Sequence, residues 1–274
     1  MEKILNNKNK SNSVNNTKVL SNLKLPKISV EHAYNLKFFQ QPNTLQLAKQ
    51  LLGSILATKI NGKLTAGIII ETEPYMGSFD KASHAYKNKK TQRTKIQFEA
   101  GGYNYIFFVY GMYYQYCIVT NKKDIPDAIL IRSILPITGL KTMVKRRYFF
   151  KKYSKEKLKK VSSNYQLAND FLNKFKDEQE FFNFAINSKN KIPNFIRNLA
   201  NGPGKLTIAL DITNKQHENL ANKSSLWMQP FLKFKPNDIV AKPRIGIDYA
   251  QEYAKKPWRF YVNKPEFIKW VSVK

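Results

Sequence analysis

GIIIETEPYMGSFDKASH, residues 67–84, joins a short apolar run to a group of acidic and ring side chains. The three isoleucines at 68–70 have the character of a buried strand. Glu71 and Glu73 stand at alternate positions, so a strand would place both carboxylates on one face. Pro74 lacks a backbone N–H, and we expect the regular ladder to end there. Reactive side chains in a sharp turn at the end of a buried strand indicate a reaction site.

Upstream of this stretch, the sequence predicts a helix and a hairpin. Leucine and alanine recur at helical spacing within 44–52, and a glycine follows as the C-cap. The dipeptide Asn61-Gly62 is favoured in type I′ turns and separates two strand-like segments, 54–60 and 63–70. The hairpin would carry the two carboxylates to its far end.

Downstream, further elements are predicted from apolar patterns and turn residues. They are a helix at 91–100, strands at 105–109, 114–119 and 128–133 with a tight turn at 110–113, a loop that enters a helix at 201–210, and two strands containing PRIGID (243–248) and PWRFYV (257–262). Arg132 lies inside the apolar run 128–135 and needs a partner if it is buried.

The charge of the chain limits its partners. Its 274 residues include 47 Lys and Arg against 19 Asp and Glu, a net charge of +28. This excess predicts polyanionic partners, nucleic acid first and an anionic membrane surface second. Heavy use of Asn and Lys explains part of the lysine content and leaves the attraction to phosphate in place. Residues 1–25 are predicted to be a disordered basic tail, and residues 26–274 one domain with a basic helical insertion at 141–198.

Several classes of protein are excluded by what the sequence lacks. Cys117 is the only cysteine, which rules out an intrachain disulfide and favours an intracellular protein. Three scattered histidines, His32, His84 and His217, match no zinc-ligand spacing, and there is no nucleotide-binding phosphate loop. We therefore expect no metal and no cofactor. The most apolar segment, 105–119, is too short to span a membrane.

Aromatic side chains cluster between residues 103 and 116. Phe107 and Phe108 taken alone favour an ordinary aromatic core. Tyr110 differs because it precedes a glycine at an expected hairpin tip, where a large ring is poorly placed for a core. In a protein of net charge +28, such a ring can insert between base pairs.

The side chains of the opening stretch suit a planar ligand and a water molecule. Surface charge is the simplest alternative for Glu71 and Glu73, but the flanking Ile-Ile-Ile and Pro-Tyr suit a surface poorly. Burial raises the pKa of a carboxyl group and nearby positive charge lowers it, so we expect an ionised, partly desolvated carboxylate that takes a proton from water. Tyr75 and His84 each offer a flat face, although a lone histidine is more often structural.

Seven segments carry a resemblance to a known family. They are, in order, IIIETEPYMGSFDKASH (68–84), TQRT (91–94), YGMYY (110–114), AILIRSILP (128–136), NGPGKLTIAL (201–210), PRIGID (243–248) and PWRFYV (257–262). This set resembles the 3-methyladenine DNA glycosylases of the alkyladenine family, over about residues 33–274 except 141–198. Together with the predicted strands, the resemblance implies one α/β (α+β) domain with a curved, mainly antiparallel β-sheet surrounded by helices.

The resemblance implies roles for individual side chains. Glu73 corresponds to the general base that activates the water attacking C1′, which leaves Glu71 a supporting role. Arg132 corresponds to the arginine that helps to hold this water. Tyr75 and His84 correspond to one wall of the pocket for the flipped base, and the histidine also contributes a main-chain contact.

Contacts to DNA follow from the same resemblance. Tyr110 corresponds to the ring that fills the gap left in the duplex, with Met112 and Tyr113 beside it in the minor groove. Arg93, which we expect to be exposed, and Lys205, at the start of a helix, are assigned to the DNA backbone.

Three positions depart from the family pattern. Pro74 replaces the usual alanine between the glutamate and the tyrosine. Phe107 stands where vertebrate members have a second stacking tyrosine. Cys117 stands where those members have an asparagine that discriminates against purines with the normal exocyclic amino group, so both residues are assigned to the base pocket. The lesion range, and above all selectivity against normal guanine, is left open by these departures.

The implied function is DNA repair by a monomeric enzyme. It flips a damaged purine, alkylated or deaminated, out of double-stranded DNA and hydrolyses the N-glycosidic bond. No lysine in the motif region is placed to form a Schiff base, so strand cleavage is not expected. The alternative is a non-catalytic DNA- or RNA-binding protein. That alternative predicts damage at Glu73, Tyr75, His84 or Arg132, and all four are intact.

Overall fold

The computed structural model describes residues 23–149, 155–187 and 189–272. Its centre is an eight-stranded antiparallel sheet in which the order of neighbours is β3-β4-β5-β2-β1-β6, and β8 pairs with both β2 and β7. The strands are β1 (Ile55–Ile60), β2 (Lys63–Tyr75), β3 (Asn104–Val109), β4 (Tyr113–Thr120), β5 (Asp127–Thr138), β6 (Leu226–Gln229), β7 (Ile239–Lys242) and β8 (Arg259–Val262).

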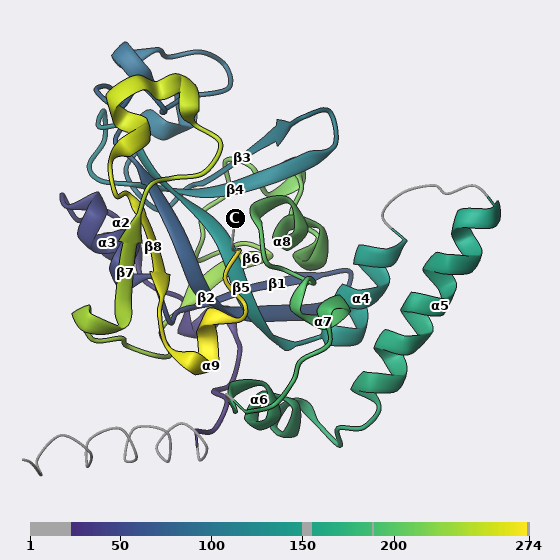
Figure 1. Cartoon of the computed structure of the whole chain (residues 1–274). Helices are drawn as coiled ribbons and strands as arrows, with labels where there is room; N and C mark the ends of the chain where they lie inside the picture. Colours follow the sequence, from purple (N-terminus) through teal and green to yellow (C-terminus); the bar gives the residue numbers. More distant parts are fainter. Residues whose placement is uncertain (1–22, 150–154, 188, 273–274) are drawn as a thin grey trace, which may run out of the picture.

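Helices surround this curled sheet, as Figure 1 shows. They are α2 (Leu36–Phe39), α3 (Thr44–Gln50), α4 (Leu140–Tyr148), α5 (Lys155–Leu172), α6 (Glu178–Ile186), α7 (Asn194–Arg197), α8 (Pro203–Leu210) and α9 (Pro265–Ile268). The prediction of one mixed α/β domain with a curved, mainly antiparallel sheet is confirmed.

The first hairpin forms as its turn residues predict. Ile60 pairs with Lys63, so two residues make the loop between β1 and β2. Asn61 has φ 49° and Gly62 has φ 73°, the left-handed backbone that a type I′ turn requires at both positions. The predicted helix that precedes the hairpin is α3.

Strands β2 and β5 form the centre of the core. Every residue of β5 is buried, and so is every residue of β2 from 65 to 74. Because both faces of these strands are covered, apolar residues stand at consecutive positions, as at 68–70 and 128–131, instead of alternating with exposed polar ones. Burial of each isoleucine at 68–70 stabilises the fold by on the order of 2 kcal/mol.

Helices α4 to α7 occupy the described part of the segment 141–198. The helix α4 buries Leu140, Met143 and Val144 in the main core. Whether this segment is an insertion stays a prediction. The basic tail predicted for residues 1–25 lies almost wholly outside the described residues.

Two predicted elements are wrong. Residues 91–100 form turns and a short 3₁₀ helix, Lys95–Phe98, in place of the predicted helix. Their buried residues, 94 and 96–98, are nearly consecutive and so do not follow the helical period. The segment 243–248 is irregular and not a strand. Its Ile245 N–H donates to the Glu73 side chain, and its Arg244 side chain binds Asp80, as described below.

Pro74 does not end the ladder, contrary to expectation. The strand β2 continues to Tyr75, and Pro74 pairs with Ile129 of β5. The carbonyl oxygen of Pro74 accepts a hydrogen bond from Arg244 Nη1 (3.1 Å), on the side away from β5. The N–H and C=O of one strand residue point to the same side. The N–H that proline lacks would therefore face away from β5, so the pairing of β2 with β5 loses no hydrogen bond.

Candidate active site

The register of the sheet places the predicted site residues in rows on one face. Tyr105 pairs with Cys117, Cys117 pairs with Leu130, and Leu130 pairs with Glu73, so one row crosses β3, β4, β5 and β2. Residues directly opposite each other in paired strands project to the same face. Glu73 and Cys117, 44 positions apart in the sequence, therefore share a face.

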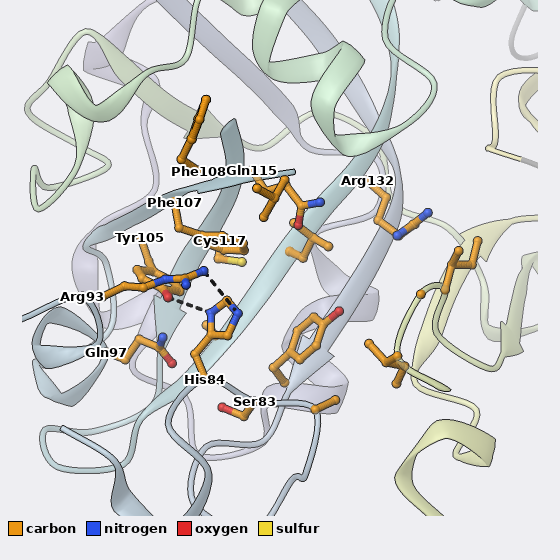
Figure 2. Close-up of a pocket in the computed structure, with 18 of the residues that line it drawn as sticks. Ser83, His84, Arg93, Gln97, Tyr105, Phe107, Phe108, Gln115, Cys117 and Arg132 are labelled. Atoms are coloured by element: carbon orange, nitrogen blue, oxygen red, sulfur yellow. Dashed lines mark hydrogen bonds between the residues drawn. The ribbon is translucent and has the colours of Figure 1, made fainter. Parts of the chain in front are cut away.

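A neighbouring row completes the floor of the site. Phe107 pairs with Gln115, and Arg132 follows Leu130 by two positions and so lies on the same face. Above these rows lies a cavity of about 290 Å³, a volume near the lower end for small-molecule pockets. Figure 2 shows the labelled lining residues around this cavity, with Arg93 and His84 on one side and Arg132 on the other.

Glu73 is fully buried directly behind the cavity. Its Oε1 accepts from the Ile245 N–H (3.0 Å) and lies 3.2 Å from Arg132 Nη1, and its Oε2 accepts from the Tyr75 hydroxyl (3.0 Å). All three partners line the cavity. Burial raises the pKa of Glu73, and the charge of Arg132 opposes this rise. The carboxylate is thus more basic than an exposed one and is held one side chain away from the cavity.

Arg132 is buried and paired, as its place in an apolar run requires. Its Nε donates to Glu71 Oε1 (3.2 Å), while its Nη1 faces Glu73. Glu71 also accepts from Arg259 Nη1 (2.9 Å) and from Ser272 Oγ (2.6 Å). The two glutamates thus have different surroundings. Glu71 anchors the arginine, and Glu73 faces the cavity residues.

His84 is held in one protonation state by its neighbours. Burial, followed by the charge of Arg93, lowers the pKa of His84 to about 4, so the ring is neutral near pH 7. Its Nε2 contacts Arg93 Nη2 (3.3 Å), and its Nδ1 contacts the Tyr105 hydroxyl (2.8 Å). A guanidinium group only donates, so Nε2 accepts, and Nδ1 carries the proton and donates to the Tyr105 oxygen.

Arg93 lies over the cavity although its residue is largely exposed. Its guanidinium carbon is 5.0 Å from the centre of the Phe107 ring, a cation–π distance. The rings of His84 and Phe107 meet edge to face, with centroids 4.8 Å apart. Arg93 is therefore a lining residue of the cavity in this structure, and its assignment to the DNA backbone stays a prediction.

An ion pair that the sequence did not predict supports the pocket. Arg244 donates from Nη1 and Nη2 to the two carboxylate oxygens of Asp80 (2.5 and 2.8 Å), and both side chains are fully buried. The same guanidinium lies 4.6 Å from the centre of the Tyr75 ring. Asp80 also accepts from the backbone N–H groups of Met76 and Ala82. This pair fixes the loop between Tyr75 and His84.

Three further residues line the cavity. Cys117 is buried, and burial together with Glu73 raises the pKa of its thiol, which is therefore neutral. Gln97 and Gln115 also line the cavity and were not predicted. The only signal for Gln115 was its place two residues before Cys117 on a strand, which puts both on one face.

The hairpin tip between β3 and β4 projects beside the cavity. Tyr110 has φ 53°, Gly111 has φ 61°, and the Tyr110 side chain is 78% exposed. Met112 is exposed at the same tip. Tyr113 packs against the first turn of α8, where a Cβ on Gly204 would lie 3.0 Å from the tyrosine ring.

Lys205 lies in the same first turn of α8, where it holds neighbouring loops together. Its Nζ donates to the side-chain oxygens of Asn198 and Asn201 (3.0 Å each). Burial lowers the pKa of this lysine. A DNA contact by Lys205 stays a prediction.

Neither a metal-binding cluster nor a membrane-spanning helix is found in the described part of the chain. Among those residues, no group of three or more His, Cys, Asp and Glu side chains could hold a metal ion. No helix there combines the length and the apolar character needed to cross a membrane.

A ring-lined cavity with an arginine at its floor and a buried carboxylate behind it fits enzymes that take a flipped base into a pocket. The comparison with known families agrees. The model of the methylpurine-DNA glycosylases (MPG) matches residues 37–266, and the chain belongs to this family.

Relatives of similar length support this membership. A "Putative 3-methyladenine DNA glycosylase" of Clostridium novyi (strain NT) is 36% identical over 234 residues, 85% of this chain and 96% of the relative. A relative with the same description from Chlamydia abortus is 39% identical over 226 residues, 82% of this chain and 96% of the relative. The resemblance drawn from the motifs is confirmed. The chain is a DNA glycosylase of the 3-methyladenine type, a hydrolase that acts on N-glycosyl bonds.

Proposed function

We propose that this glycosylase rotates a damaged purine out of duplex DNA into the cavity and hydrolyses its N-glycosidic bond. The observation that carries the proposal is the contact (3.2 Å) between Arg132, which lines a cavity walled by aromatic rings, and Glu73, which lies directly behind it. The rings would hold a planar base, and the carboxylate and the arginine would hold a water beside its sugar bond.

The energetics of base extrusion are consistent with this site. Extruding a base costs a few kcal/mol, and less when a lesion weakens pairing. Stacking on aromatic rings returns about 1–3 kcal/mol per base. Tyr75, Phe107 and His84 supply such rings in the cavity, and the exposed Tyr110 supplies a ring that can fill the gap in the duplex.

The chemical step follows from the surroundings of Glu73. The water oxygen attacks C1′, its proton passes to Glu73, and the C1′–N9 bond breaks with its electron pair going to the base. The raised pKa of Glu73 makes this carboxylate a better proton acceptor than an exposed one. A purine methylated on a ring nitrogen carries a positive charge, so it leaves as a neutral molecule and needs little further help.

The product is an abasic site in an uncut strand. No lysine is found among the cavity-lining residues that the structure describes, which supports water as the nucleophile and argues against a Schiff base with the sugar. We infer a monofunctional enzyme that works on damaged purines in double-stranded DNA and functions as a monomer without a cofactor.

A duplex containing one 7-methylguanine tests the proposal. The wild type should release free 7-methylguanine, and Glu73→Gln should slow the release by about 10²–10⁴-fold, because it removes the general base and keeps the shape. The strand should break only after heating in alkali. Circular dichroism and a thermal melt establish that the variant is folded. Release by Glu73→Gln at the wild-type rate would refute the assigned base. A wild type that binds the duplex but releases no free base would favour the non-catalytic alternative.

A further inference from the structure

The starting observation is the position of the Arg93 guanidinium. It contacts His84 Nε2 (3.3 Å) and stacks over Phe107 (5.0 Å), and both are walls of the cavity. Figure 2 shows Arg93 with these two residues at one end of the cavity and Arg132 at the other. Arg93 and Arg132 are the only two cationic side chains among the described lining residues.

The sheet sets the distance between these two ends. Phe107 lies on β3, and Arg132 lies on β5, with β4 between them. Two strand spacings separate them by on the order of 10 Å. A purine whose sugar bond lies over Glu73 and Arg132 must extend across Cys117 toward Phe107. The base edge opposite its sugar bond then meets His84 and Arg93.

The two groups at that end have complementary chemistry. The His84 ring is neutral, and its Nε2 accepts a hydrogen bond from Arg93. The imidazole therefore offers no positive charge to the base. The guanidinium of Arg93 brings N–H donors and a fixed charge. In a purine, the edge opposite N9 carries the substituent at position 6, which is a carbonyl oxygen in hypoxanthine and in guanine derivatives.

We propose that Arg93 contacts the position-6 oxygen of the flipped base and stabilises the negative charge that a neutral base acquires on leaving. When the C1′–N9 bond of a hypoxanthine nucleotide breaks, its electron pair enters the ring and spreads to that oxygen. The water proton rests on Glu73 and later returns, through solvent, to the departed base. Arg93 donates and gives up no proton. This inference rests on the proposed base-excision function.

The consequence is a division between two classes of substrate. A neutral deaminated purine depends on Arg93, because no other described lining residue at that end of the cavity has a positively charged side chain to offset its developing charge. A cationic alkylated purine leaves as a neutral molecule, so Arg93 offers it no such assistance and repels its charge before the bond breaks. Arg93 is therefore a catalytic residue for neutral lesions and an obstacle for cationic ones.

The test compares hypoxanthine with 7-methylguanine, two bases that share the oxygen at position 6 and differ in charge. Release of each from a duplex is measured in single turnovers at saturating enzyme and mildly acid pH, where 7-methylguanine is fully cationic. Arg93→Met keeps an unbranched side chain against Phe107. It should slow hypoxanthine release by roughly 10²-fold relative to 7-methylguanine release, because only the neutral base loses an oxyanion donor. Arg93→Lys should recover part of the hypoxanthine rate.

Lys95→Met is the matched control. It removes one positive charge from the same turn, where Lys95 faces Glu218 at 3.5 Å on the surface and does not line the cavity. This variant should release both bases at the wild-type rates. Equal slowing of both bases by Arg93→Met, or the same effect from Lys95→Met, would make Arg93 a contact to the DNA backbone and overturn the inference. A wild type inactive on hypoxanthine would also overturn it. Failure of the proposed base-excision function can be told apart from failure of this inference, because the wild type would then release no 7-methylguanine either.

Discussion

At the scale of single residues, the site separates two glutamates that the sequence presents as equivalent. Glu71 is surrounded by arginine and serine donors, and its carboxylate is fully engaged in anchoring Arg132. Glu73 accepts from one hydroxyl and one backbone N–H and faces the same arginine at 3.2 Å. Desolvation dominates at Glu73, which is the condition that makes a carboxylate useful as a base near neutral pH.

Base release should therefore depend on pH through Glu73. Burial raises the pKa of this group above its ordinary value of 4.5, so its ionised fraction falls as the pH drops through that raised value. The rate of 7-methylguanine release should decline on the acid side with a midpoint above 4.5. His84, with a pKa of about 4, is neutral throughout this window and does not contribute. Single-turnover rates against pH provide the measurement.

The Glu73→Gln variant is the control for that profile. Its residual rate should lose the acid limb, because an amide does not titrate. An acid limb of the same midpoint in the variant would assign the titration to another group and remove Glu73 from the role of base.

At the scale of elements, the hairpin β3–β4 unites two parts of the site. Its strands carry Phe107, Gln115 and Cys117 into the cavity, and its tip carries Tyr110 out into solvent. The left-handed backbone of Tyr110 and Gly111 turns the chain at that tip. The element thus fixes the position of the exposed ring relative to the cavity.

Replacement of that ring should affect paired lesions most. Tyr110→Ala should slow release of 7-methylguanine from a duplex by roughly tenfold to a hundredfold, because the unstacked gap loses its filler. Release from an unpaired lesion in a bubble should change little. The free energy of unfolding should stay near the wild-type value, since the side chain is 78% exposed. Leu167→Ala, a truncation of an exposed side chain on α5, is the control. Equal losses on paired and unpaired lesions would contradict the role.

The loop 76–84 is held by the buried ion pair of Asp80 and Arg244. Asp80→Ala leaves the guanidinium buried without its partner, which should lower the free energy of unfolding by about 3–5 kcal/mol. Urea denaturation measures this loss. The double variant Asp80→Leu with Arg244→Met should recover most of it, because neither charge is then buried alone. A loss below about 1 kcal/mol in Asp80→Ala would mean that the pair does not clamp the loop.

The sequence predicts local elements here better than it predicts long-range partners. Asn61-Gly62 fixes the first hairpin because the turn requires two left-handed residues, a constraint that lies within the dipeptide itself. The partners Asp80 and Arg244 are 164 positions apart, and no local pattern links them. The segment 243–248 resembles a strand in composition. It is irregular because Ile245 donates its N–H to Glu73 and Arg244 turns inward.

The same contrast holds within the candidate site. Glu73, Tyr75 and His84 share one stretch of sequence. Tyr75 and His84 line the cavity, and Glu73 lies behind it, bonded to the Tyr75 hydroxyl. Arg93 was expected on the surface, and the residue is largely exposed, but its guanidinium lies over the Phe107 ring. The direction of a flexible side chain depends on which rings surround it after folding, and the sequence does not contain that information locally.

At the scale of the whole molecule, charge and chemistry are spatially separate. The net charge of +28 acts on the DNA backbone from exposed side chains. Glu73 and Glu71 are fully buried and Arg132 is nearly so, and buried pairs are screened by salt much less than exposed ones. Salt should therefore weaken DNA binding strongly while it leaves the chemical step almost unaffected.

An ionic-strength series tests this separation. If about six to ten phosphates are contacted, the affinity for undamaged duplex should fall by roughly 10³–10⁵ between about 50 and 200 mM salt, because each neutralised phosphate releases counterions. Fluorescence anisotropy measures this affinity. The single-turnover rate of 7-methylguanine release, taken at enzyme concentrations that saturate the DNA at each salt concentration, should change less than about twofold, because the reacting groups are sheltered from solvent. A rate constant that falls in parallel with the affinity would place salt-sensitive surface contacts within the chemical or flipping step.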